Sequence, residues 1–191
     1  MSAFDLYFDN VIKKWEGGTG ERPANEDTGG LTVHGVTIGY WLSGANKIVN
    51  KPATRAGLLS LTWDEAKKIS KIDFWDKRKI NTILNPALRP FVSDAYWLGG
   101  GLASLGFSSI SALNRSIFTT PTDLYNARMK YLRSLKNWEY NKNGWTNRIN
   151  DVLKTAKKIN LKTMVIGGGV LTSLIVGTIL IKKNYGTKQF N

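Results

Sequence analysis

The stretch KWEGGTGERPANEDTGGLTVHGVTIG, residues 14–39, combines many glycines with an unusual cluster of acids. Glycine permits tight turns and a close approach of the backbone to other groups. The carboxylates of the stretch are Glu16, Glu21, Glu26 and Asp27. Apolar and polar residues alternate over residues 31–38, which is the period of a β-strand. We therefore expect an acid-bearing loop that leads into a small β-hairpin.

Helical periodicity surrounds this stretch on both sides. Apolar residues recur every three or four positions over residues 4–15, which predicts an amphipathic helix. Further helices are expected around 40–50, over 62–74, near 91–98, and in two segments after residue 121 that are separated by a break at 141–144. Thr62 and Glu65 form a capping box, and Thr122 or Asp123 is expected to cap a later helix. The fold class is therefore mainly α.

Charge and composition limit the partners of the chain. Its 191 residues suffice for one domain, and 27 Lys and Arg against 14 Asp and Glu give a net charge of +13. Such a surface favours acidic partners, namely nucleic acid, anionic lipid or a wall polymer. No nucleic-acid-binding motif accompanies the charge, so we expect no specific nucleic acid partner. The absence of cysteine excludes disulfides and thiolate metal sites, and no metal or other cofactor is expected.

The C-terminal part differs in kind from the rest. Residues 163–181, TMVIGGGVLTSLIVGTILI, contain no charged side chain. A helix of this length spans roughly 28 Å, close to the ~30 Å hydrocarbon core of a bilayer. Lysines flank both ends, where their ammonium groups would reach the lipid head groups. We predict one transmembrane helix, whose glycines at 167–169 and 177 would allow self-association.

Glu16 is a candidate general acid. It follows Trp15 at the end of the first predicted helix, and apolar neighbours there would favour the protonated carboxyl that proton donation at neutral pH requires. Glycoside hydrolysis needs one such acid and a second group on the opposite face of the sugar. The candidates for this second group are Glu21, Glu26, Asp27 and Thr32. The alternative is a solvated acidic loop that binds a cation.

Three motifs in order resemble the glycoside hydrolase family 108 muramidases of phages and bacteria. W-E-G-G followed by D-T-G-G-L-T-x-x-G-V-T, residues 15–18 and 27–37, is similar to the family's N-terminal signature. LTWDEAKKISKIDFWDK, residues 61–77, is similar to a Leu-Thr-x-x-Glu-Ala helix that leads to a Tyr-Trp-Asp element. KNGWTNRINDV, residues 142–152, is similar to the closing Gly-Trp-x-x-Arg segment.

The resemblance implies a lysozyme-like helical fold and cleavage of the bond between N-acetylmuramic acid and N-acetylglucosamine. On this basis Glu16 is the general acid, while Asp27 and Thr32 stabilise charge or position water. Thr28 stands where the family has proline, and the loop is about two residues longer, so Glu26 is an alternative to Asp27. Inverting, retaining and transglycosylase mechanisms all stay open, because they depend on the separation of the two groups.

Aromatic residues supply the candidate sugar contacts, because their rings can stack on the apolar faces of sugars or simply fill the core. These candidates are Tyr40, Trp41, Tyr96 and Trp97. His34, at a position where the family often has tyrosine, is expected to have a structural or substrate-contacting role. Trp145 and Arg148 are expected to pack and to form a salt bridge.

The predicted organisation is a muramidase domain at 1–156, a basic juxtamembrane linker at 157–162, a transmembrane helix at 163–181 and a short basic tail at 182–191. The N-terminus lacks the features of a secretory leader, so the enzyme domain is expected first on the cytoplasmic side of a host inner membrane or a viral internal membrane.

The expected function is a membrane-anchored peptidoglycan hydrolase, either a phage virion lysin used during penetration of the host or a lysis enzyme. Its expected partners are glycan strands, a lipid membrane, and capsid proteins or a second copy of the chain. The alternative is a non-catalytic, membrane-anchored structural protein of the virion with a muramidase-like fold.

Overall fold

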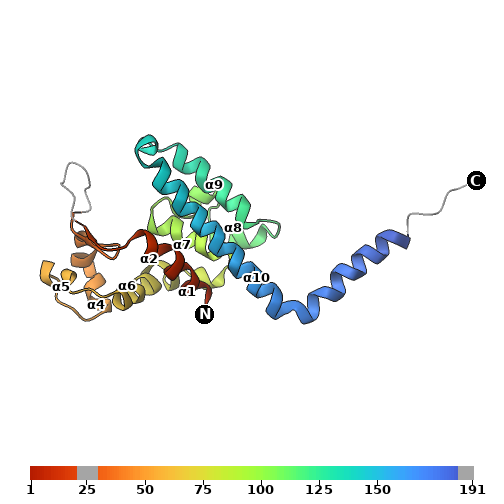
Figure 1. Ribbon diagram of the computed structural model, residues 1–191, viewed down its shortest axis with the longest axis horizontal. Helices are drawn as coiled ribbons and strands as arrows, with labels where there is room; N and C mark the ends of the chain where they lie inside the picture. The colour runs from red at the N-terminus through yellow and green to blue at the C-terminus, as the bar shows by residue number, and fades with distance from the viewer. Residues whose placement is uncertain (21–29, 185–191) are drawn as a thin grey trace, which may run out of the picture.

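The structure is a computed structural model that describes residues 1–20 and 30–184, with side chains described up to residue 161 (Figure 1). It is mainly helical, as the sequence predicts, and contains one small three-stranded sheet that includes the predicted hairpin. In chain order the elements are α1 (Ala3–Tyr7), η1 (Phe8–Ile12), α2 (Lys13–Trp15), β1 (Thr19–Gly20), β2 (Thr32–Val33), β3 (Val36–Thr37), α3 (Ile38–Tyr40), η2 (Trp41–Ala45), α4 (Asn46–Ile48), α5 (Arg55–Leu59), α6 (Trp63–Ser70), η3 (Lys71–Asp76), η4 (Ile80–Thr82), η5 (Pro86–Leu88), α7 (Arg89–Trp97), η6 (Gly101–Leu105), α8 (Ile110–Arg115), α9 (Pro121–Arg133) and α10 (Trp138–Asn184).

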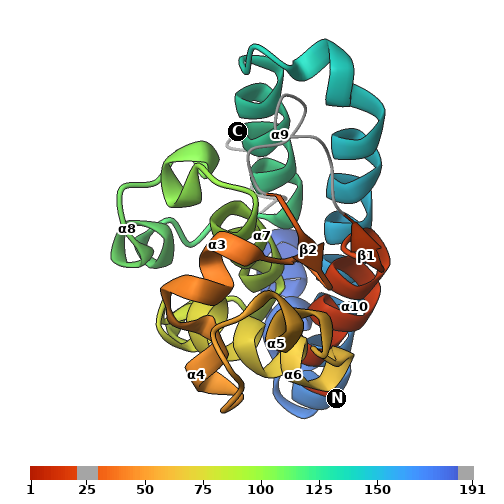
Figure 2. The ribbon, with the colours of Figure 1, turned by 90° about the vertical axis from the view of Figure 1, so that its left-hand side faces the viewer.

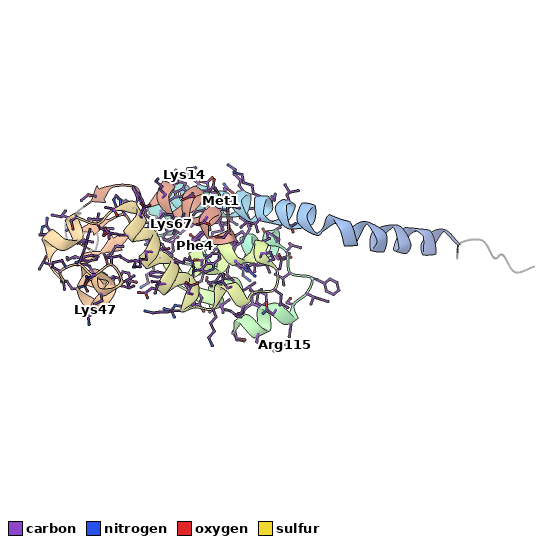
Figure 3. The ribbon with its side chains drawn as sticks, turned by 90° about the horizontal axis from the view of Figure 1, so that it is seen from below. Met1, Phe4, Lys14, Lys47, Lys67 and Arg115 are labelled. Carbon is purple, nitrogen blue, oxygen red and sulfur yellow. The ribbon has the colours of Figure 1, made fainter. Side chains whose placement is uncertain are left out.

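The first three elements form one continuous helix over residues 3–15, which confirms the predicted amphipathic helix. Ser2 and Asp5 cap its start by a reciprocal pair of side-chain hydrogen bonds to the backbone. Its inner face carries Tyr7, Val11 and Ile12, which are fully buried. Figure 3 shows the opposite side of the helix, where Lys14 lies at the outer edge of the molecule. The burial of this one face holds Glu16, the next residue, against the rest of the protein.

The predicted hairpin is present between β2 and β3. The two strands are antiparallel, with Val33 opposite Val36. His34 and Gly35 form the two-residue turn, and both have positive φ angles, 50° and 80°, as tight antiparallel hairpins require. β1, which the sequence did not predict, pairs with β2 on the other side. Figure 2 shows this sheet between the N-terminal helix and α3.

Two clusters of buried apolar side chains hold the helices together. The larger one joins the N-terminal helix to α7, α9 and α10, and its centre includes Phe8, Phe91 and Val152. The smaller one joins the hairpin to η2, α5 and α6. Trp63, the first residue of α6, packs against both clusters. Figure 1 shows the two groups of elements next to one another along the long axis, with α4 and α5 at the end away from α9.

The cap of α9 differs from the prediction. Thr120, rather than Thr122 or Asp123, is the N-cap residue. Its hydroxyl accepts a hydrogen bond from the backbone of Asp123, whose carboxylate in turn accepts from the Thr120 backbone at 2.8 Å. Pro121 explains the difference. Proline is favoured at the first helical position, so the N-cap is the residue immediately before it, Thr120. Asp123 takes part in the cap from the third helical position.

The predicted helix break at residues 141–144 is wrong. Helix α10 begins at Trp138 and runs through this segment, while the interruption between α9 and α10 lies at 134–137. The rings of Trp138 and Trp145 lie 6.3 Å apart, and both pack against the larger cluster. This packing outweighs the weak helix propensity of the asparagines and of Gly144 between them.

The C-terminal region gives no support to the predicted membrane anchor. Within the described part of the chain, no helix combines the length and the apolar character that crossing a bilayer requires. The backbone of α10 continues through residues 163–181 (Figure 1), but the side chains of this segment lie outside the described residues. Most of the predicted tail at 182–191 lies outside them as well.

Candidate active site

Glu16 lies where four parts of the fold meet. It is the residue that ends α2, and its carboxyl oxygen Oε1 accepts two hydrogen bonds. Trp97 of α7 donates its indole N–H at 2.9 Å, and Arg148 of α10 donates from Nη1 at 2.5 Å. The Glu16 side chain is 19% exposed. The fold therefore holds one oxygen of this carboxyl tightly while leaving the side chain in partial contact with solvent.

The neighbours of Glu16 differ from the apolar surroundings that the sequence suggested. The indole N–H of Trp15 donates to Asp151 at 2.9 Å. The groups that reach Glu16 are a polar indole N–H and a guanidinium, and both stabilise the negative charge of a carboxylate. These two donors fix the orientation of the Glu16 side chain. The sequence had instead suggested apolar neighbours that exclude water from it.

A buried network supports the guanidinium that binds Glu16. Arg148 donates from Nε to Oδ1 of Asp94 at 2.9 Å, and the hydroxyl of Tyr7 donates to the same oxygen at 3.2 Å. The side chains of Arg148 and Asp94 are only 5% and 1% exposed. Burial lowers the pKa of Arg148, but the charges of Asp94 and Glu16 outweigh burial, so its pKa lies above the ordinary value. Arg148 is therefore a permanent cation shared between two carboxylates.

The hairpin turn closes over the same point. A Cβ atom at Gly35 would lie 2.7 Å from the indole of Trp97 and 3.0 Å from Cβ and Cγ of Glu16. The neighbouring backbone N–H, that of His34, donates to the carbonyl of Gly18 at 3.0 Å. Only a glycine fits this close approach at a positive φ angle. The hairpin is thus positioned directly against the acid and the residue that binds it.

The predicted second group is only partly visible. Thr32 lies on β2, half-buried, and its hydroxyl donates weakly to the carbonyl of Gly30 at 3.4 Å. Thr32 therefore belongs to the same hairpin that contacts Glu16 through Gly35. Asp27 and its alternative Glu26 lie outside the described residues, as do Glu21 and Thr28.

His34 packs in a way that favours its structural role. Its imidazole stacks on the ring of Trp63 at a centroid distance of 4.1 Å and an angle of 26°. Burial lowers the pKa of His34 from its ordinary value of 6.5. Nδ1 is buried without a hydrogen-bond partner among the described residues. The ring therefore joins the hairpin to α6 as a neutral aromatic group.

The four predicted sugar-contacting aromatics divide into two kinds. Trp41 is fully buried, with its indole N–H bound to the carbonyl of Pro52 at 3.0 Å, so the prediction that it contacts sugar is wrong. Tyr40, Tyr96 and Trp97 are half-buried. Trp97 binds Glu16 itself, which is a closer connection to the site than the sequence suggested.

Two features of the site were missed or only partly foreseen from the sequence. Arg148 was expected to form a salt bridge, but its partners were not predicted, because Glu16 and Asp94 are 132 and 54 residues away in the chain. Asp94 was not singled out at all. An acid among the apolar residues of a buried helix, as in RPFVSDAYW, was the signal that could have identified it.

No metal centre accompanies these residues in the described part of the chain, where no group of three or more His, Cys, Asp or Glu side chains could hold a metal ion. The chemistry that the arrangement offers is that of a carboxyl group with one oxygen fixed by two donors and with a second oxygen to present to a substrate.

Comparison with known proteins bears on the segment that contains this carboxyl. Residues 9–100 match the family model described as glycosyl hydrolase 108. The matched segment includes Glu16, the hairpin, α6 and Trp97, whereas Arg148 lies beyond it. No curated protein and no solved structure matches the chain. The match supports the family resemblance drawn from the sequence and, at a coarse level, a glycoside hydrolase that acts on peptidoglycan.

Proposed function

We propose that this protein is an N-acetylmuramidase, a peptidoglycan hydrolase that cleaves between N-acetylmuramic acid and N-acetylglucosamine with Glu16 as the general acid. The observation that carries the proposal is the fixed position of Glu16 between Trp97, Arg148 and the hairpin, inside the segment that matches the family. A lysozyme-like classification of the fold belongs to the same proposal and rests on that match.

In this proposal the two oxygens of Glu16 have different tasks. Oε1 accepts from Trp97 and Arg148, so these donors hold the side chain in one orientation. The transferable proton then resides on Oε2. On reaction, this proton passes to the bridging oxygen as its bond to the anomeric carbon breaks, and water supplies the hydroxyl that replaces it. The proton released by water passes to a base.

The second group of the reaction comes from the loop and the hairpin. Asp27, or Glu26 in its place, would steady the positive charge at the anomeric carbon or activate the water, and Thr32 would help to position that water. Thr32 supports this proposal through its place on β2, beside the turn that contacts Glu16.

Purified peptidoglycan provides the direct test. The full-length protein is expected to release new reducing ends, and Glu16→Gln is expected to release them at least 100-fold more slowly, since general acid catalysis contributes about 10²–10⁴-fold. Glutamine keeps an oxygen that can accept from Trp97 and Arg148 but carries no transferable acidic proton. Glu139→Gln, at a carboxyl that is 79% exposed on α10, is the matched control and should retain full activity. Equal rates for Glu16→Gln and the parent would show that another residue is the acid.

One observation favours a second candidate, a non-catalytic protein that uses a muramidase-like fold as a structural or glycan-binding component. The 2.5 Å ion pair of Glu16 with Arg148 could serve stability alone. In that case neither the parent nor Glu16→Gln would release reducing ends, although both would bind peptidoglycan in a pull-down with insoluble wall material.

Membrane attachment through residues 163–181 is part of the proposal and rests on the sequence alone. The expected partners beyond glycan are a lipid membrane and, in a virion, capsid proteins or a second copy of the chain. Flotation with liposomes tests attachment: the full-length protein should rise with the vesicles, and a chain ending at residue 161 should not. Detection of the protein in purified virions would favour a role in penetration of the host over a role in lysis.

A further inference from the structure

A pocket of about 350 Å³ lies next to Phe74, and the proposed function leaves it without a role. Its lining residues are Tyr40, Asp73, Phe74, Lys77 and Arg78. Tyr40 ends α3, and the others come from η3 and the two residues that follow it. The volume is within the range of roughly 300–1,000 Å³ that is usual for pockets that bind small ligands.

A chain of aromatic rings connects this pocket to Glu16. The ring of Tyr40 contacts that of Phe74 at a centroid distance of 5.7 Å, and Phe74 contacts Trp97 at 4.6 Å. Trp97 then donates its indole N–H to Glu16. Two ring contacts and one hydrogen bond therefore link the pocket to the acid, and we expect a group attached to the bound glycan strand to reach it.

The charges of the pocket leave one cation available. The charge of Asp73 is paired within the protein, because the Tyr40 hydroxyl donates to one of its oxygens and Lys77 forms an ion pair with the other. Burial, together with the bond to Asp73, raises the pKa of Tyr40, so the hydroxyl stays protonated. Arg78 is different: its guanidinium lies 4.9 Å from the centre of the Tyr96 ring, and no carboxylate of a described residue forms an ion pair with it.

The arrangement of Arg78 suits the capture of a carboxylate. A guanidinium held against an aromatic ring keeps its N–H groups in a fixed planar fork, which matches the two oxygens of a carboxylate. The faces of Tyr40 and Phe74 would cover the apolar part of the same ligand. A neutral sugar carries no carboxylate that could form an ion pair with Arg78.

We propose that this pocket binds the peptide stem of the glycan strand, with Arg78 holding a stem carboxylate and the rings of Tyr40 and Phe74 packing on the peptide. The inference rests on the proposed function, since the stem is attached to N-acetylmuramic acid, the sugar at the cleaved bond. The pocket makes the enzyme selective for strands that carry stems over bare glycan.

Kinetics on matched substrates test the specificity. Soluble glycan strands are prepared free of phosphate polymers, and half of them are then stripped of stems with an amidase. Arg78→Gln in the full-length protein should raise KM about 10-fold on stem-bearing strands, which corresponds to about 1.4 kcal/mol and to the loss of one hydrogen-bonded charge pair. On stripped strands the difference between Arg78→Gln and the parent should vanish. Lys68→Gln, which removes an exposed charge of α6 outside the pocket, is the control and should match the parent on both.

Other results would overturn the inference. An equal loss on stem-bearing and stripped strands would mean that Arg78 does not read the stem. A loss that appears only on walls that retain phosphate polymers would identify phosphate as the ligand instead. If the parent cleaves neither substrate, the proposed function fails. Binding of a stem peptide then decides whether the pocket is a stem site.

That binding measurement is independent of catalysis. A synthetic stem tripeptide, titrated to millimolar concentration, should shift the ring resonances of Tyr40 and Phe74 in the parent and in Lys68→Gln but not in Arg78→Gln. Arg78→Lys, which keeps the charge and loses the planar fork, should give an intermediate response. Absence of any shift in the parent would refute the proposed stem site.

Discussion

Individual side chains explain why the candidate acid is so well placed. Arg148 lies between the carboxylates of Glu16 and Asp94, and nearly all of its surface is buried. A buried charge is tolerable only while it is paired, so each member of this network depends on the others. The sequence could indicate a salt bridge for Arg148 but could not name its partners, because they come from remote helices and only tertiary packing brings them together.

This dependence predicts the outcome of a double-mutant cycle. Arg148→Gln should lower the free energy of unfolding by about 3 kcal/mol, because it leaves the buried carboxylate of Asp94 unpaired. Adding Asp94→Asn removes that charge and should restore part of the loss. Activity should not return with stability, since Glu16 still lacks its guanidinium. Urea unfolding and reducing-end release measure the two quantities, and additive losses of stability would contradict the coupling.

Gly35 offers a second test at a single position. Gly35→Ala places a methyl group 2.7 Å from Trp97 at a φ angle of 80°, so the turn must move away from the acid. We expect a loss of stability of about 1–3 kcal/mol and reduced activity. Gly39→Ala is the matched control, because nothing lies within 4 Å of its Cβ position. Equal effects of the two substitutions would argue against contact between the turn and Glu16.

His34 makes stability depend on pH in a defined direction. Burial lowers its pKa below 6.5 in the folded protein, so below that pH the unfolded chain binds more protons than the folded one. Acidification through this range therefore destabilises the fold. His34→Asn, whose side chain tolerates the positive φ angle, should lose less stability between about pH 7.5 and about pH 5.5 than the parent does. Equal losses in urea unfolding would exclude this role.

The helices and the hairpin were predictable wherever local sequence determines them. Thr62 and Glu65 form the predicted capping box, since both partners lie within one turn. The alternation over residues 31–38 gave the hairpin, because its turn and both strands are contiguous. Prediction failed at the start of α10, where the tryptophans pack on distant residues and override a segment of poor helix formers.

The cap of α9 provides a test of one such assignment. Thr120→Ala removes the hydroxyl that accepts from the Asp123 backbone and should cost about 1 kcal/mol of stability. Thr122→Ala, two residues later on the exposed surface of the same helix, should change stability by less than about 0.5 kcal/mol. Chemical denaturation of both variants decides between them. A larger effect at Thr122 would restore the position predicted from the sequence.

The molecule as a whole places the candidate acid where its two apolar clusters meet. The N-terminal helix, the hairpin, α7 and α10 belong to different parts of the chain, yet all four contribute to the surroundings of Glu16. The motifs are short and local, so they point to Glu16 as the candidate acid. They could not indicate Trp97 or Asp94 as its supports, since those residues are brought close only by the mutual packing of the N-terminal helix, α7 and α10.

The central claim is that Glu16 donates a proton to the glycosidic oxygen that links N-acetylmuramic acid to the next sugar. Mass spectrometry of the fragments released from purified peptidoglycan tests it most directly. The parent should give fragments that end in N-acetylmuramic acid, and Glu16→Gln should give almost none. Fragments that end in reducing N-acetylglucosamine, or equal yields from Glu16→Gln, would contradict it.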